Sequence, residues 1–205
     1  MKIKVLITAV NSSPGRAVLN SLKNKKNLQI YYMDSDESSV FFYQKDKNFF
    51  LAPKAKEKSY KKFINNLIKK KKINIIIPCI EPEVLFFSKN QRYFAKKVKM
   101  LLPPFSVINK VTNKYKLYLE CKKLGIDTPP TKEISFPLKK KINSLKFPLI
   151  VKPTFGWGMK NVKVIKNSKD FKQKTSNLRG KFIIQKYLGD FKKNIYAVGL
   201  LMDKD

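Results

Sequence analysis

The first 105 residues alternate between apolar runs and amphipathic stretches, and this alternation restricts the fold more than any other feature of the chain. The run IKVLITAV at 3–10 has the continuous apolar character of a strand buried on both faces, and the loop NSSPG leads from it into a helical stretch at 16–24. Strands that alternate with helices form βαβ units, whose strands lie parallel in one sheet with helices on both faces. We therefore predict a doubly wound α/β domain.

The same pattern continues to residue 104. In the helical stretch at 57–72, apolar residues recur at i, i+3 and i+4 from Tyr60 to Ile68, which leaves the lysines on the opposite, solvated face. We expect further strands at 28–34, 49–53, 73–80 and 98–104, a short helix or turn at 41–44, and helices at 57–72 and 82–97.

A doubly wound sheet binds its ligand at the carboxyl ends of its strands. In this chain those ends lead into residues 11–15, 34–37 and 79–83. The loop at 11–15 could receive a phosphate at a helix N-terminus, but it lacks the GxGxxG pattern of a dinucleotide site. Glu81 and Glu83 are interpreted either as acid/base or orienting groups, or as acidic residues that favour the dipole of the following helix.

The organisation changes after Pro103 and Pro104. Thr112 is predicted to cap a helix that ends at Gly125, and a turn through IDTPPT then leads into a strand. The β-type runs FPLIVKP, VKVI and KFIIQKYL follow, with a helical insert between the last two, so this half has an α+β and mostly antiparallel character. We place a boundary near residue 110 and predict domains 1–109 and 110–205.

The charge of the chain points first to nucleic acid or an anionic membrane, because 45 basic and 14 acidic residues give +31. However, Arg16, Arg92 and Arg179 are the only arginines, and arginine is the residue favoured for base readout and bidentate phosphate contacts. The lysine excess accompanies abundant Asn, Ile, Phe and Tyr, a pattern that an AT-rich genome imposes through its codons. No basic stripe is interleaved with stacking aromatic residues. We expect no specific nucleic-acid partner, and a nucleic-acid-binding protein is the less favoured alternative.

Two amino-acid types restrict the chemistry further. Histidine is absent, which excludes Ser-His and Cys-His dyads and His-ligated metal. Cys79 and Cys121 are far apart in the sequence and indicate neither a zinc site nor a disulfide framework. No apolar run approaches the ~18 residues of a membrane span. We expect a cytoplasmic protein with free thiols and no membrane association.

The segment FPLIVKPTFGWGMKNVKVI at 147–165 places a lysine at the end of a strand, beside a loop with two glycines. By itself this pattern fits a hairpin with an exposed lysine. Together with VTNKYKLYLECKKLGIDTPPT before it and FIIQKYLGD after it, the segment resembles the first lobe of an ATP-grasp ligase. The first 105 residues resemble the domain that precedes this lobe. INIIIPCIEPEVLFFSKNQRYF in particular is similar to the carbamoyl-phosphate synthase large chain and to its short relatives that join a carboxylate to an amine.

This resemblance implies a fold and an activity. The fold is a Rossmann-like pre-ATP-grasp domain followed by the first lobe of an ATP-grasp domain, truncated at its C-terminus. The activity is that of a ligase, which transfers the γ-phosphoryl group of ATP to a carboxylate so that an amine can attack the acyl phosphate. A non-catalytic nucleotide-binding remnant or a regulatory module is the alternative. The implied ligands are ATP and small-molecule carboxylate and amine substrates.

The resemblance also assigns site residues. Lys152 corresponds to the lysine that meets the α-phosphate and the adenine edge, and Lys114 to the other basic residue of the nucleotide site. Residues 154–161 correspond to the mobile loop that covers the β- and γ-phosphates. The predicted nucleotide-binding residues are Lys114, Lys152, Thr154, Gly156 and Gly158, and the adenine-binding segment Gln185, Lys186, Tyr187 and Leu188.

The chain departs from the family pattern at several points. Lys186 stands where a Glu is frequent, and Ile195 falls nearest to the place of the acidic residue that holds the ribose hydroxyls. Asp190 is the candidate substitute, with a place in a surface turn as the alternative. In the family a second lobe brings the Glu and Asn residues that hold Mg²⁺, so we predict no metal ligand within these 205 residues. We expect a longer protein or a partner chain to supply that lobe, and no ligase turnover without it.

Overall fold

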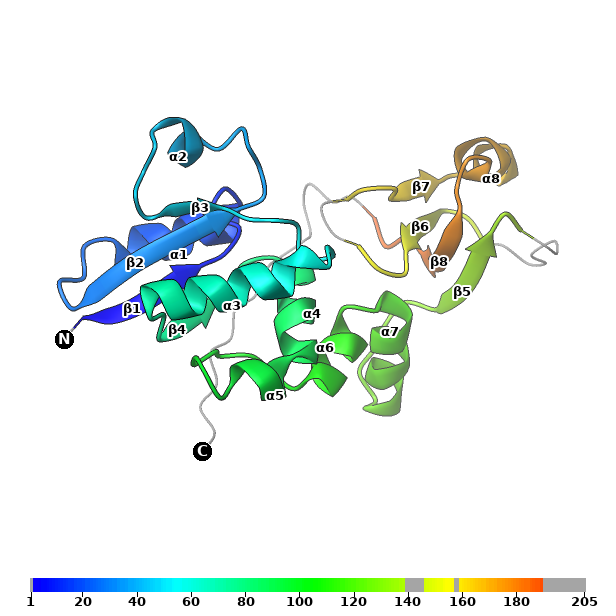
Figure 1. Ribbon diagram of the computed structural model, residues 1–205. Helices are drawn as coiled ribbons and strands as arrows, with labels where there is room; N and C mark the ends of the chain where they lie inside the picture. Colours follow the sequence, from blue (N-terminus) through cyan, green and yellow to red (C-terminus); the bar gives the residue numbers. More distant parts are fainter. Residues whose placement is uncertain (1, 139–145, 157–158, 190–205) are drawn as a thin grey trace. The chain divides into compact units, whose positions relative to one another are not determined.

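Two four-stranded sheets organise the described part of the chain (Figure 1). The structure is a computed structural model that describes residues 2–138, 146–156 and 159–189. The chain divides into two units, Met1–Thr112 and Asn113–Asp205, which we call unit 1 and unit 2. The predicted boundary between residues 109 and 110 falls within helix α6 (Phe105–Val111), and it stays a prediction about independently folding domains.

Unit 1 is built on a parallel sheet with the strand order β3-β2-β1-β4. This arrangement confirms the doubly wound α/β fold predicted from the alternation of apolar runs. Its strands are β1 (Ile3–Ile7), β2 (Leu28–Asp34), β3 (Phe49–Leu51) and β4 (Ile75–Ile77), and its first helices are α1 (Ser13–Leu22), α2 (Val40–Tyr43), α3 (Ser59–Lys71), α4 (Glu81–Lys89) and α5 (Gln91–Phe94).

Each face of this sheet is covered by helices. On one face Leu6 and Met33 belong to a buried cluster that also holds Ile64 of α3 and Phe87 of α4. On the other face Val5, Ile7 and Tyr32 pack with apolar side chains of α1. Because successive residues of a strand point to opposite faces, the continuous apolar run of β1 supplies both cores.

One predicted strand of unit 1 is wrong. Residues 98–104 form no ladder with β4, and Lys99 alone bridges to Ile75. The N–H of Lys99 donates to the carbonyl of Asn74 at 2.8 Å, and its own carbonyl accepts from Ile76 at 3.0 Å. The run then ends in Pro103 and Pro104, which have no amide hydrogen with which to extend a ladder.

Two helix predictions in unit 1 also need correction. The helix expected over 82–97 is two helices, because α4 ends at Lys89 and the Asn90 side chain donates to the carbonyl of Phe86 at 2.8 Å. Helix α6 was not predicted. It is only 7 residues long, and no side chain caps its first turn.

The described residues of unit 2 form an antiparallel sheet with the strand order β5-β8-β6-β7, together with the helices α7 and α8. This confirms the α+β, antiparallel character predicted for the second half. The elements are α7 (Lys114–Lys123), β5 (Thr131–Phe136), β6 (Leu149–Pro153), β7 (Lys163–Ile165), α8 (Ser168–Thr175) and β8 (Gly180–Lys186).

The two faces of the β6 strand have different roles. Leu149 and Val151 belong to the core cluster that Phe171 of α8 completes. The alternate residues, Ile150 and Lys152, point to the opposite face. Lys152 is therefore placed outside the core by the register of the strand.

Helix α7 begins one residue later than predicted. Its N-cap is Asn113, whose side-chain oxygen accepts the amide hydrogens of Tyr115 and Lys116 at 3.0 and 2.9 Å. The hydroxyl of Thr112, the predicted cap, instead donates to the carbonyl of Ile108 in α6 at 2.8 Å. The helix ends as predicted before Gly125, which has a φ of +71°.

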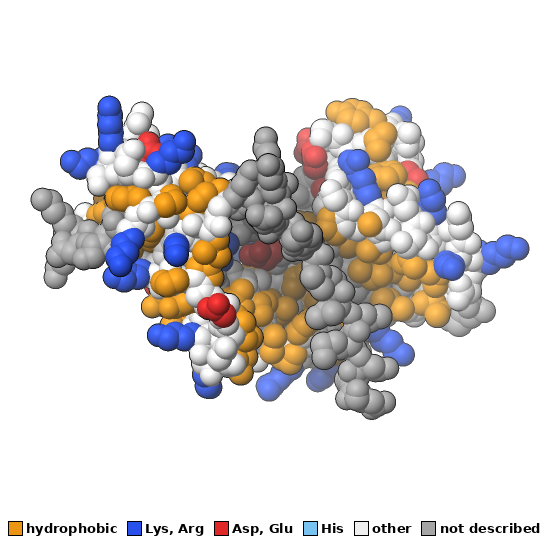
Figure 2. Space-filling model, turned by 180° about the vertical axis from the view of Figure 1, so that it is seen from behind, with side chains coloured by type: hydrophobic (Ala, Val, Ile, Leu, Met, Phe, Trp, Pro, Cys, Tyr) orange, Lys and Arg blue, Asp and Glu red, His pale blue; other side chains and the backbone are white. Residues whose placement is uncertain are grey.

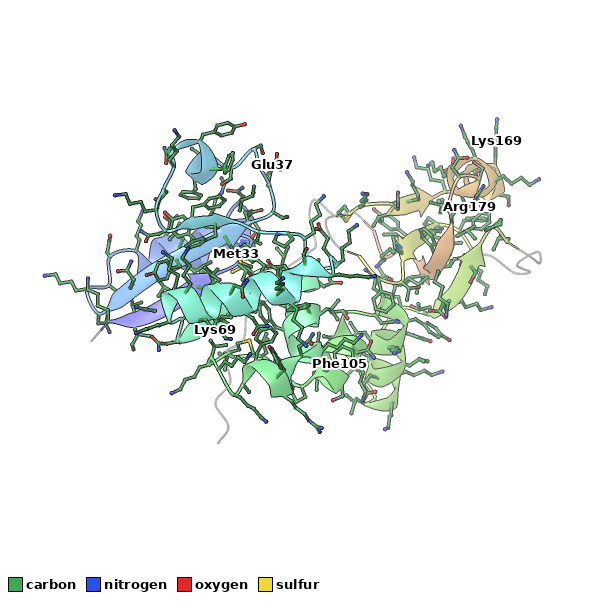
Figure 3. The ribbon with its side chains drawn as sticks, viewed as in Figure 1. Met33, Glu37, Lys69, Phe105, Lys169 and Arg179 are labelled. Carbon is green, nitrogen blue, oxygen red and sulfur yellow. The ribbon has the colours of Figure 1, made fainter. Side chains whose placement is uncertain are left out.

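On the face drawn in Figure 2, lysine and arginine side chains lie at separate places and form no single continuous patch among the described residues. Lys69 on α3 and Lys169 on α8 both have exposed side chains (Figure 3). This distribution matches the solvated helix face predicted for 57–72. In the described ranges, no helix has the length and apolar character that crossing a bilayer requires.

Candidate functional site

The first turn of α7 holds the loop that follows β6. The amide N–H of Lys114 donates to the carbonyl of Thr154 at 2.9 Å, and its Nζ donates to the carbonyl of Gly156 at 2.7 Å. Asn113 is buried, and its capping bonds fix the backbone from which Lys114 projects. The structure thus brings together Lys114, Thr154 and Gly156, which are far apart in the sequence.

Lys152 lies next to this contact, at the end of β6. Its side chain is half-buried, and burial is the main cause that lowers the pKa of its ammonium, with the positive charge of Lys114 as the second cause. Two ammonium groups that repel each other in a partly dry setting favour a bound anion, because an anion offsets both charges.

Thr154 adds a polar group to the same region. Its hydroxyl is buried and has no hydrogen-bond partner among the described residues. Buried hydroxyl groups are normally hydrogen-bonded, so this one is available to a water molecule or a ligand.

Gly156 has a φ of +132°, a conformation that side chains rarely tolerate, and in this conformation its carbonyl accepts from Lys114. This explains why a glycine is needed at this position. Gly158, the second glycine of the predicted loop, lies outside the described residues.

The predicted adenine-binding segment begins at the end of β8. The Gln185 amide donates from Nε2 to the Thr131 hydroxyl at 2.9 Å, so β5 fixes its orientation. The N–H of Lys186 donates to Pro130 at 3.4 Å, and the N–H of Tyr187 donates to Pro148 at 3.1 Å.

Two main-chain groups in this segment have no backbone hydrogen-bond partner among the residues that the structure describes. The carbonyl of Lys186 receives no hydrogen bond from Pro130, because proline has no amide hydrogen. Within the described residues, the N–H of Leu188 donates to no backbone acceptor, and the Leu188 side chain is 72% exposed. An acceptor and a donor two residues apart thus lie at the open end of β8.

The sequence did not single out two of the residues that organise unit 2, Asn113 as the cap of α7 and Thr131 as the partner of Gln185. The signal for Asn113 was present, because Asn is as good an N-cap residue as Thr. No local signal identified Thr131, since its contact with Gln185 crosses 54 residues of sequence.

Unit 1 has its own polar group at the carboxyl ends of its strands. Glu83 is 6% exposed and accepts hydrogen bonds from the hydroxyls of Thr8 and of Tyr60, the latter at 3.2 Å. Burial raises the pKa of the Glu83 carboxyl to about 7 against the lowering effect of these bonds, and the charge of Asp34 raises it further. The Thr8 hydroxyl in turn accepts the N–H of Cys79 at 3.1 Å.

The loops after β1 and β2 also meet at this edge. The Asp34 carboxylate accepts the amide hydrogens of Asn11 and Asp36 at 2.8 and 3.1 Å. The predicted carboxyl-end segments are thus joined by hydrogen bonds, with Glu83 as a buried acid that links β1 to α3 and α4. Among the described residues, no group of three or more Cys, Asp or Glu side chains could hold a metal ion.

A known protein family matches the first part of the chain. Residues 5–101, most of unit 1, match the family described as the PylC-like N-terminal domain. None of the curated proteins matches the chain.

Solved structures extend the likeness across both units. The L-amino acid ligase from Bacillus licheniformis has a TM-score of 0.70 at 15% identity, over 91% of this chain and 44% of the ligase. The carboxyaminoimidazole ribonucleotide synthase from Aspergillus clavatus, solved with ATP, has a TM-score of 0.61 at 18% identity, over 90% and 47%. The D-alanine–D-alanine ligase from Bacillus anthracis has a TM-score of 0.60 at 19% identity, over 92% and 58%.

These matches confirm the resemblance on which the sequence interpretation depended. The fold is that of the N-terminal part of ATP-grasp ligases. The chain spans between 44% and 58% of the length of the three solved proteins.

Proposed function

We propose that this chain forms the leading domain and the first nucleotide-binding lobe of an ATP-grasp ligase, which activates a carboxylate as an acyl phosphate for attack by an amine. The observation that carries the proposal is that Lys114 donates to Gly156 in the loop at 154–156, which follows the strand that carries Lys152. Two lysines, an unpaired buried hydroxyl and a glycine backbone are groups suited to a polyphosphate.

The residues of this site fit ATP. Lys152 would contact the α-phosphate, and Lys114 would exchange the Gly156 carbonyl for a phosphate oxygen. Bound ATP supplies the phosphoryl group, and the lysines contribute charge compensation and positioning, which dominate phosphoryl transfer. The Thr154 hydroxyl, which has no hydrogen-bond partner among the described residues, would donate to a phosphate oxygen.

The end of β8 is suited to an adenine edge. The Lys186 carbonyl is an acceptor for the exocyclic amino group, and the Leu188 N–H is a donor for a ring nitrogen. The Lys186 and Tyr187 amide hydrogens already bond to proline carbonyls. The main chain of Lys186 would therefore recognise the base, although its side chain replaces a frequent Glu.

Among the described residues, no group of three or more Cys, Asp or Glu side chains could by itself hold a metal ion. We therefore derive no step through the metal. The carboxylate and amine substrates remain proposals at the level of chemical class, taken from the ligases that share the fold.

The proposal is tested by calorimetric titration of the chain with a non-hydrolysable ATP analogue. Lys152→Ala should weaken binding by about 1.5–3 kcal/mol, the usual worth of a charge-assisted hydrogen bond. Lys166→Ala, which removes an exposed lysine just after β7, is the control and should leave the affinity unchanged. Thermal melts of both unliganded variants should stay close to the parent. Equal affinities of the two variants would show that Lys152 is not a phosphate ligand.

A further inference from the structure

Lys114 and Lys152 differ in how their charges are stabilised. The ammonium of Lys114 donates to the Gly156 carbonyl at 2.7 Å, and such a hydrogen bond favours the charged form. Among the described residues, the ammonium of Lys152 has no hydrogen-bond or ion-pair partner. The ammonium of Lys114 thus has an acceptor at hand, whereas the pKa of the Lys152 ammonium is lowered by burial and by the charge of Lys114.

The neighbours of Lys152 on the sheet strengthen this difference. Lys152 pairs with Ile183 across β8 and follows Ile150 on its own strand, and these isoleucines are 2% and 4% exposed. Side chains at these positions share one face of the sheet. Burial against apolar side chains disfavours an ammonium, and it is the first cause of the lowered pKa of Lys152.

The acidic residue on this face does not compensate the charge of Lys152. Glu133 pairs with Ile183 from the far side of β8, so a strand separates it from Lys152. Its carboxylate instead lies 3.9 Å from the ammonium of Lys181, which is 69% exposed. Proteins make the amine of a lysine nucleophilic by placing it next to another cation or in a desolvated site.

We propose that Lys152 is a nucleophilic lysine and a site of acylation by small acyl phosphates, of which acetyl phosphate is the simplest. The inference rests on the proposed function in one respect, that Lys114 and Lys152 together attract a phosphate group. Lys114 holds the phosphate while the uncharged amine of Lys152 reaches the acyl carbon.

The chemical step is balanced without any further reactant. The Nζ lone pair of Lys152 attacks the acyl carbon and forms an amide bond, while the bond from that carbon to the bridging oxygen breaks. Inorganic phosphate leaves with the bonding electrons, and the proton lost by the amine passes to solvent. The product amide has no charge, so acylation removes one of the two cations of the site.

The experiment treats the full chain with limiting acetyl phosphate and follows acetylation of each lysine-containing peptide by mass spectrometry. We expect Lys152 to react severalfold faster than Lys181, which lies on the same face of the sheet but is exposed and faces Glu133. Equal rates at the two lysines would overturn the proposal.

Two variants test the role of Lys114. Lys114→Met removes both the neighbouring charge and the phosphate contact, so it should slow acetylation of Lys152 towards the rate of Lys181. Lys114→Arg keeps a cation and a donor and should retain fast acetylation. A Lys152 rate that does not change in Lys114→Met would contradict the proposal.

A non-hydrolysable ATP analogue separates this inference from the proposed function. Fast acetylation of Lys152 that the analogue blocks supports both. Fast acetylation that the analogue does not affect supports the nucleophilic lysine and counts against the nucleotide site. Binding of the analogue without any preference for Lys152 leaves the proposed function standing and refutes the inference.

Discussion

At the scale of the residue, Glu83 is the buried acid of unit 1 whose charge state depends on the fold. Its pKa is raised from 4.5 to about 7, chiefly by burial. The folded state therefore binds the proton more tightly than the unfolded state does between these values. The free energy of unfolding should fall as pH rises from 4.5 to 7 and stay low above it, by at most on the order of 3 kcal/mol.

Glu83→Gln tests this dependence, because the amide imitates the protonated acid. The variant should lose most of the stability difference between pH 5 and pH 8, and it should be at least as stable as the parent at pH 8. The measurement is urea unfolding at both pH values, with hydrogen exchange of the β1 amides as the probe of unfolding. Glu37→Gln changes an exposed acid of the same unit (Figure 3) and should keep the parent's dependence on pH. The same dependence in Glu83→Gln would show that another group is responsible.

At the scale of the element, Asn113 decides where α7 begins. Asn113→Ala should destabilise unit 2 by about 1 kcal/mol, because the amide hydrogens of Tyr115 and Lys116 lose their acceptor. Thr112→Ala should reduce stability by less than Asn113→Ala, since the Thr112 hydroxyl only adds a hydrogen bond to the carbonyl of Ile108. Urea unfolding followed by the fluorescence of Trp157, the single tryptophan of the chain, measures both. A larger loss in Thr112→Ala would restore the cap predicted from the sequence.

Elements were predictable where a local pattern decides them. The strand β1 and the helix α3 follow from apolar periodicity, and the end of α7 follows from Gly125. The strand predicted at 98–104 was wrong, because an apolar run does not reveal how many of its residues find a pairing partner, and here Lys99 alone bridges to β4. The contacts of the candidate site could not be predicted either, because they join residues that are far apart in the sequence. Lys114 reaches Gly156 across 42 residues, and the antiparallel register alone places Lys152 opposite Ile183.

At the scale of the whole molecule, the net charge is +31, and on the face drawn in Figure 2 the basic side chains lie at separate places. Such a surface attracts polyanions without selecting a sequence, because lysine ammonium groups act as point charges and release counterions from DNA. Arg179 is exposed and forms hydrogen bonds within its own loop. Its guanidinium donates to the carbonyls of Ser176 and Leu178 at 3.0 and 2.8 Å.

We therefore expect weak binding to duplex DNA that falls steeply with salt and does not depend on sequence. Fluorescence anisotropy with two labelled duplexes of equal length and unrelated sequence, over a series of salt concentrations, measures this. Each phosphate that is neutralised contributes a slope of about −0.9 in a plot of log K against log salt, so both duplexes should show the same steep line. Nanomolar affinity for one of the duplexes at physiological salt would contradict this expectation, because dispersed lysines provide no means of selecting that sequence.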